Sequence, residues 1–142
     1  MQIVYLDLNL MEKMCHRVAV AVFNQESDPI PPFSTHTEQL LDSALNLPKQ
    51  TFGGADLYKT LTDKAIILYY ALIKNHPFPN GNKRMATASL LVFLFINNYW
   101  LETTPAELAE WAIKVAESKQ KDPMIVELGL WLEGRIKKVD IQ

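Results

Sequence analysis

Residues 75–95 read NHPFPNGNKRMATASLLVFLF, and this stretch decides the fold. Proline, asparagine and glycine crowd its first half and predict a tight loop, because each of them interrupts a helix or favours a turn. Lys83 and Arg84 follow, and they lead directly into an apolar run. A helix so rich in Leu and Phe is hydrophobic almost all round, so we expect the helix over 82–97 to be the central one.

The remaining sequence predicts one all-α domain over residues 1–142. Apolar residues recur at helical spacing on both sides of the loop, and Asp7 is a suitable N-cap for the first helix. Thr104-Pro105-Ala106-Glu107 has the pattern of a capping box with proline at the first helical position, and Asp122-Pro123 repeats the cap-then-proline signal. The helices expected from these signals cover residues 8–23, 37–46, 60–75, 82–97, 104–118 and 122–138.

Three segments are expected to be non-helical. Residues 3–6 are predicted to form a short extended entry, and three prolines make 24–34 a loop. Pro48 is expected to stop the helix before it. The two adjacent glycines in PKQTFGGADLY, residues 48–58, then predict an extended flap or a tight hairpin.

Composition narrows the class of protein. Apolar residues make up 49% and charged residues 21%, the net charge is −2, and the pI is about 5.9. These values are ordinary for a globular protein, and we expect no membrane insertion and no direct binding of nucleic acid. The single cysteine, Cys15, has no partner for an internal disulfide, which suits a reducing, cytoplasmic compartment.

The loop has the chemistry of an anion site beside a base. A helix that begins just after a glycine presents unpaired N–H groups and the positive end of its dipole. Lys83 and Arg84 in that first turn oppose the dipole, which suggests that their charges serve an anion. Gly81 allows a phosphate to approach the backbone, Asn82 adds amide donors, and His76 can act as a general base near neutral pH.

The nine residues His76-Pro77-Phe78-Pro79-Asn80-Gly81-Asn82-Lys83-Arg84 resemble the motif of the Fic/Doc family, His-x-Phe-x-(Asp/Glu)-(Gly/Ala)-Asn-(Gly/Lys)-Arg. The flanking segments LLDSALNLPKQTFGGADLY, residues 40–58, and LLVFLFINNYWL, residues 90–101, resemble the flap region and the central helix of that family. The resemblance covers about residues 3–118. It implies a compact Fic/Doc helical fold with a short flap before the motif.

Two positions make the chain similar to the death-on-curing, or Doc, branch. Members that transfer nucleotides usually carry glycine where this chain has Lys83, and often a second arginine where it has Thr87. The Doc branch contains toxins of toxin–antitoxin pairs. The activity that the resemblance implies is transfer of the γ-phosphate of ATP to a Ser or Thr hydroxyl of elongation factor Tu, which stops translation.

The resemblance also implies roles for individual residues. His76 would take the proton from the target hydroxyl, and Gly81, Asn82, Lys83 and Arg84 would hold the phosphates and the developing charge. Phe78 would be structural.

In the same reading the flap would receive an extended segment of the target by strand addition. The residues expected to form this docking flap are Thr51, Phe52, Gly53 and Gly54.

Asn80 departs from the family pattern, in which an acidic residue at this position helps to hold Mg²⁺ near the phosphates. An amide oxygen can bind Mg²⁺ but contributes no negative charge. The sequence therefore leaves three readings open: a Doc-like kinase, transfer of AMP or another nucleotide, and a catalytically impaired binding protein. The self-inhibitory helix pattern of some Fic proteins is absent, which implies a separate antitoxin chain that folds onto the toxin.

Overall fold

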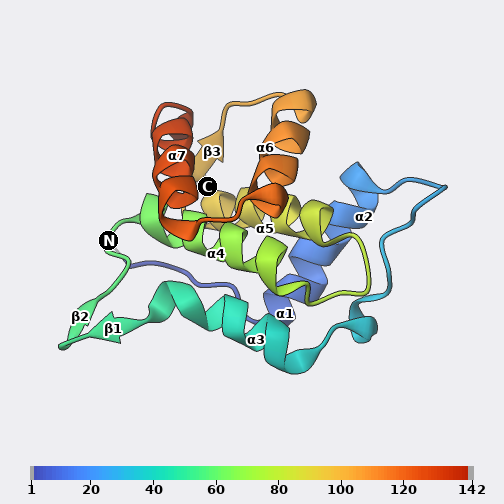
Figure 1. Cartoon of the computed structure of the whole chain (residues 1–142), viewed down its shortest axis with the longest axis horizontal. Coiled ribbons are helices and arrows are strands. Elements are labelled where there is room, and N and C mark those ends of the chain that lie inside the picture. The colour runs from blue at the N-terminus through green and yellow to red at the C-terminus, as the bar shows by residue number, and fades with distance from the viewer. Residues whose placement is uncertain (1, 141–142) are drawn as a thin grey trace.

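The computed structural model describes residues 2–140. Short flanking elements surround a helical core (Figure 1). The first third of the chain contains α1 (Leu8–Leu10), η1 (Met11–His16), α2 (Arg17–Phe23), η2 (Phe33–Thr35), α3 (Glu38–Asn46) and η3 (Leu47–Lys49). The remainder contains β1 (Thr51–Phe52), β2 (Ala55–Asp56), α4 (Leu61–Asn75), α5 (Asn82–Ile96), β3 (Tyr99–Leu101), α6 (Pro105–Glu117), α7 (Lys121–Glu133) and β4 (Ile136–Lys138).

Helix α5 lies at the centre of the fold, as its composition predicted. It packs along α4, and α6 and α7 stand on one side of this pair while α3 lies on the other (Figure 1). Ten of its residues are buried, including Met85, Leu90, Phe93 and Leu94. Because α5 has neighbours on every side, it needs no polar face.

The helix that opens the chain is less regular than its sequence pattern suggested. Asp7 is the N-cap, and its carboxylate accepts a hydrogen bond from the Leu10 N–H at 2.8 Å. The predicted helix over 8–23 is continuous, but its middle, η1, has the wider π-helical hydrogen bonding. Residues 3–6 enter without belonging to a strand, so the expected extended entry forms no sheet.

The segment around the flap follows the prediction closely. Strands β1 and β2 pair antiparallel, with Thr51 opposite Asp56, and Gly53 and Gly54 make the turn with φ of 60° and 82°. Positive φ at both positions is the reason why glycine is needed there. Pro48 does not end the helical path at once, because η3 continues α3 for one further turn.

The C-terminal end corrects two predictions. The last helix begins at Lys121, so Asp122 is not its N-cap, and it ends at Glu133 instead of continuing to residue 138. Residues 136–138 form β4, which pairs antiparallel with β3 and places Ile136 opposite Leu101. Gly134 follows the last helical residue with φ of −79°, so this helix ends without the left-handed glycine that closes many helices.

Only half of the capping box at α6 forms. The Thr104 hydroxyl accepts a hydrogen bond from the Glu107 N–H at 3.2 Å. The Glu107 carboxylate instead accepts from the Thr103 hydroxyl, the Trp131 indole and the Arg135 guanidinium at 2.6, 3.2 and 2.7 Å. Glu107 thereby ties the start of α6 to α7 and to the residue before β4.

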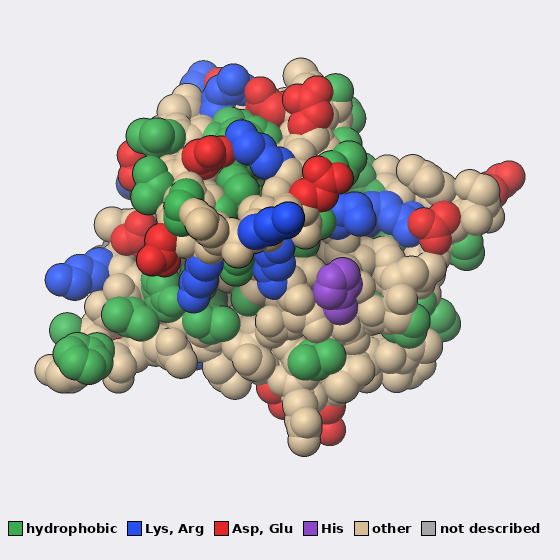
Figure 2. Space-filling model, viewed as in Figure 1, with side chains coloured by type: hydrophobic (Ala, Val, Ile, Leu, Met, Phe, Trp, Pro, Cys, Tyr) green, Lys and Arg blue, Asp and Glu red, His purple; other side chains and the backbone are tan. Residues whose placement is uncertain are grey.

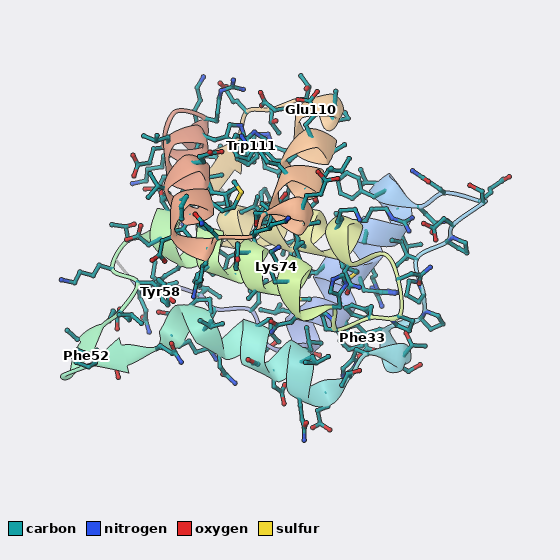
Figure 3. All side chains as sticks on the ribbon, in the orientation of Figure 1. Phe33, Phe52, Tyr58, Lys74, Glu110 and Trp111 are labelled. Atoms are coloured by element: carbon teal, nitrogen blue, oxygen red, sulfur yellow. The ribbon has the colours of Figure 1, made fainter. Side chains whose placement is uncertain are left out.

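A lysine ties the end of α4 to the end of α6. The ammonium of Lys74 donates to the backbone carbonyls of Ala116 and Ser118 at 3.1 and 2.5 Å, where the last carbonyls of α6 lack helical partners. Lys74 lies on the side of α4 that faces the α6–α7 connection (Figure 3). Among residues 2–140, no helix is both long enough and apolar enough to cross a membrane.

Candidate functional site

The loop between α4 and α5 gathers the motif residues at one end of the central helix pair. His76 ends α4 in the left-handed conformation, with φ of 50° and ψ of 58°. Such a conformation is strained for a residue that carries a side chain. It turns the chain sharply, so that the exposed imidazole lies beside the start of α5.

Asn82 locks this loop from inside. Its side-chain oxygen accepts from the Phe78 N–H and its amide nitrogen donates to the Phe78 carbonyl, both at 2.9 Å. The same amide nitrogen lies 3.4 Å from Nδ1 of His76. The Asn82 side chain, which the sequence suggested as a phosphate donor, is therefore occupied within the protein. It holds the loop and orients the imidazole.

Phe78 anchors the loop to the core. Its side chain is 3% exposed and its ring lies 5.9 Å from that of Phe33, centroid to centroid. The backbone carbonyl of Pro77 accepts a hydrogen bond from the Thr37 N–H at 2.8 Å, just before α3. The loop is thus fixed from both sides before any ligand binds.

The start of α5 offers free backbone donors. Gly81 is the N-cap with φ of 73°, and the first bond of the helix runs from the Met85 N–H to its carbonyl at 2.9 Å. The N–H groups of Asn82, Lys83 and Arg84 precede that bond and have no acceptor within the helix. The Lys83 side chain is exposed beside them.

Arg84 is engaged by a residue that the sequence did not identify, Asp28. Arg84 donates to the Asp28 carboxylate at 3.0 Å and to the Asp28 carbonyl at 2.7 Å, with a further contact to the Phe23 carbonyl at 3.4 Å. The second carboxylate oxygen of Asp28 accepts from the Asn80 amide at 2.9 Å. A carboxylate of the protein thus lies against the arginine that was expected to face phosphate.

Asp28 belongs to the projecting loop between α2 and η2 (Figure 1). Local hydrogen bonds shape this loop: the Asn24 side chain accepts from the Ile30 N–H at 2.7 Å, and His16 Nε2 lies 2.7 Å from the Pro31 carbonyl. The sequence separates Asp28 from Arg84 by 56 residues, so no local pattern pairs them.

A cavity of about 450 Å³ opens beside this end of α5. That volume is within the usual range for small-molecule sites. Its polar wall includes Asp28, Gly81, Lys83 and Arg84. Its apolar wall comes from the end of α2 and from α6, with the side chains Val22, Phe23, Pro105, Leu108, Ala109, Ala112 and Ile113. His76 does not line the cavity, and Asn82, which does, stands between it and the imidazole.

The oxygen donors near Asn80 fit only a metal ion that brings other ligands with it. Asn80 and Asp28 supply one amide and one carboxylate, and residues 2–140 contain no cluster of three or more His, Cys, Asp or Glu side chains placed to hold a metal. Mg²⁺ at nucleotide sites is commonly bound through one or two carboxylates together with phosphate oxygens. The donor set therefore suits Mg²⁺ already bound to a nucleotide.

The predicted docking flap lies away from this cavity, at the opposite end of α4 from His76 (Figure 1). Its residues Thr51, Phe52, Gly53 and Gly54 are all exposed. The structure thus brings the motif residues together at one site and places the flap at another.

The sequence matches known proteins in the region that carries this site. Residues 5–94 match the family described as Fic/DOC. The chain is also 45% identical over 62 residues to the protein named Toxin Doc from Mycolicibacterium smegmatis (strain ATCC 700084 / mc(2)155), and these residues are 44% of this chain and 48% of that protein. The chain thus aligns with about half the length of this curated relative. No solved structure matches the chain.

Proposed function

The chain belongs to the Fic/DOC family, and we propose that it is a Doc-like toxin that transfers the γ-phosphate of ATP to a Ser or Thr hydroxyl of a translation factor such as elongation factor Tu. The observation that carries this proposal is the meeting of an exposed imidazole with the free N-terminus of α5 and two cations. Its neutralising partner would be a separate antitoxin chain, and its compartment the cytoplasm.

His76 is the proton acceptor in the proposed reaction. Nδ1 of His76 lies 3.4 Å from the amide nitrogen of Asn82. That distance is long for a hydrogen bond, so the contact orients the ring without fixing which nitrogen carries the proton. As the target oxygen forms its bond to the γ-phosphorus, the bond from that phosphorus to the β-phosphate oxygen breaks, the hydroxyl proton moves to His76, and ADP leaves.

The start of α5 stabilises the phosphates. The backbone N–H groups of Asn82, Lys83 and Arg84 point along the helix axis toward an anion, and the Lys83 ammonium adds a mobile positive charge. Mg²⁺, bound with ATP near Asn80 and Asp28, would supply further charge neutralisation. The cavity between α2, α5 and α6 is of a size to take the rest of the nucleotide.

A second reading, a protein that binds its partners but catalyses poorly, is favoured by the contacts of Asp28. This carboxylate holds both Arg84 and Asn80, and Asn80 lacks the charge that the family pattern places there. In this reading the fold is competent, and the charge balance at the site limits the reaction.

Intact-protein mass spectrometry of elongation factor Tu, incubated with the protein, ATP and Mg²⁺, tests the proposal. A phosphate-sized mass increase that is lost with His76→Ala supports the kinase. The imidazole is exposed, so this variant should keep the fold, which its melting temperature checks.

The other outcomes discriminate between the alternatives. An AMP-sized increase would replace γ-phosphate transfer by nucleotide transfer, in which the bond at the α-phosphorus breaks and pyrophosphate leaves. If Asn80→Asp modifies elongation factor Tu and the wild type does not, the wild type is the catalytically impaired binding protein. If neither the wild type nor Asn80→Asp changes the mass of elongation factor Tu, the proposed target is overturned.

A further inference from the structure

A lysine is buried where the flap joins the body of the protein. Lys64 belongs to the first turn of α4, and its side chain is 1% exposed. Its ammonium donates to the Asp56 carboxylate of β2 at 3.2 Å and to the Tyr58 carbonyl. The Tyr5 ring lies on another side, with its centroid 5.9 Å from Nζ. Both hydrogen bonds therefore reach the segment by which the flap leaves the body.

This buried charge is not needed for helix α4 itself. The helix already has a complete capping box, in which the Thr60 hydroxyl accepts from the Asp63 N–H and the Asp63 carboxylate accepts from the Thr60 N–H. Removal of an ammonium from water is unfavourable, and replacement of a whole buried ion pair by apolar side chains of similar volume is often neutral or stabilising. The buried ammonium is therefore best explained by its hydrogen bonds to Asp56 and to the Tyr58 carbonyl.

What Lys64 holds is a hairpin that is too small to maintain its own position. Strands β1 and β2 have two residues each, and every residue from 51 to 57 is exposed. Two-stranded hairpins are marginally stable in water. The base of this hairpin is closed by one backbone bond, from the Leu57 N–H to the Gln50 carbonyl at 2.8 Å.

The flap nevertheless presents a surface suited to contact. Phe52 is 81% exposed and points outward from the projecting hairpin (Figure 3), and a hydrophobic side chain is visible at that end of the space-filling surface (Figure 2). In the fold, β1 pairs only with β2 among the described residues, so its other edge keeps free backbone groups. An extended polypeptide could pair with that edge and cover the aromatic ring.

We propose that Lys64 is a positioning residue: its buried ammonium fixes the flap on α4, so that the open edge of β1 and the Phe52 ring face an arriving protein substrate. The role in substrate binding rests on the proposed function together with the expectation, implied by the family resemblance, that the flap receives an extended segment of the target. The tether itself concerns residues of this chain alone, so it can be tested independently of any reaction.

Hydrogen exchange measured by mass spectrometry tests the tether in wild type and Lys64→Met. The peptide that covers residues 50–58 should exchange at least tenfold faster in the variant, while α5 keeps its rates and the melting temperature does not fall. Lys59→Met is the matched control, because Lys59 is an exposed lysine in the same connection. Unchanged exchange of the flap in Lys64→Met would overturn the proposal.

Asp56→Ala provides a second variant from the opposite side of the contact. Asp56 is exposed, so this protein should fold even if Lys64→Met does not. Its flap should also exchange faster, by a smaller factor, because the bond from Lys64 to the Tyr58 carbonyl remains. If residues 50–58 exchange no faster in Asp56→Ala than in the wild type, the ion pair between Lys64 and Asp56 does not hold the flap.

Kinetics with the protein substrate separate positioning from a general loss of structure. Lys64→Met should raise the KM for the target about tenfold and leave kcat and the KM for ATP unchanged. A fall in kcat with an unchanged KM would contradict the positioning role. If the wild type modifies no target, the proposed function fails, while the exchange experiment still decides whether Lys64 holds the flap.

Discussion

Replacement of Asp28 by Asn should strengthen phosphate binding at the start of α5. The Asp28 carboxylate lies 3.0 Å from the Arg84 guanidinium, and their side chains are 55% and 17% exposed. A pair of this kind is worth about 0.2–1 kcal/mol, which a phosphate must overcome to reach the arginine. Removal of the carboxylate also removes its repulsion of the anion, about 1 kcal/mol per charge pair at 4 Å in water.

Together these terms predict a gain of about 1–2 kcal/mol, or a roughly fivefold to thirtyfold lower Kd for Asp28→Asn. Isothermal titration with pyrophosphate, without divalent cations and at constant ionic strength, measures it. Glu26→Gln is the control, because it removes one negative charge from an exposed position of the same loop. If Asp28→Asn binds no more tightly than Glu26→Gln, Asp28 does not compete with the anion, and the reasoning is refuted.

Four further predictions concern stability. Asn82→Ala should lower the unfolding free energy in urea by about 2–5 kcal/mol, because it leaves the N–H and the carbonyl of Phe78 unpaired, and Asn82→Asp should be intermediate because it retains an acceptor. Gly81→Ala should cost about 1–2 kcal/mol in the same assay, since φ is 73°; no loss would contradict that strain. Burial raises the pKa of the Cys15 thiol from 9.0 to about 12. The contribution of this thiol to the free energy of unfolding should therefore be complete below pH 9.0 and should decline as pH rises from 9.0 toward 12. The decline should be smaller in Cys15→Ala. The hydrogen bond from the Thr103 hydroxyl, with those from Trp131 and Arg135, lowers the pKa of Glu107 below 4.5. The contribution of this carboxylate to the free energy of unfolding should be present above pH 4.5 and should be lost as pH falls further. Urea titrations at acid pH should show that Glu107→Gln abolishes this pH dependence.

Local signals predicted the helices and the motif loop well. The loop of Pro, Asn and Gly separates α4 from α5 as expected, and the Gly-Gly pair makes the hairpin turn, because these residues fix backbone geometry within a few positions. The apolar composition of α5 identified its central place. Such features depend on neighbouring residues in the chain, which is why the sequence shows them.

The features that the sequence missed depend on distant partners. Asp28 and Arg84 meet across 56 residues, and nothing near Asp28 indicates a role in the site. Residues 136–138 resembled the continuation of a helix and became a strand because β3 offers an edge. The Asn82 side chain was interpreted as facing a ligand, whereas the backbone of Phe78 occupies it.

The contact of Lys74 with α6 limits how this protein can be divided or recombined. The family match ends at residue 94, yet the ammonium two positions before His76 binds carbonyls at residues 116 and 118. A fragment cut after α5 would leave that lysine without acceptors and would strip Leu108, Val115 and Leu128 from the core. A C-terminal segment grafted from another protein would therefore have to end a helix at the same point, with its last carbonyls turned toward Lys74.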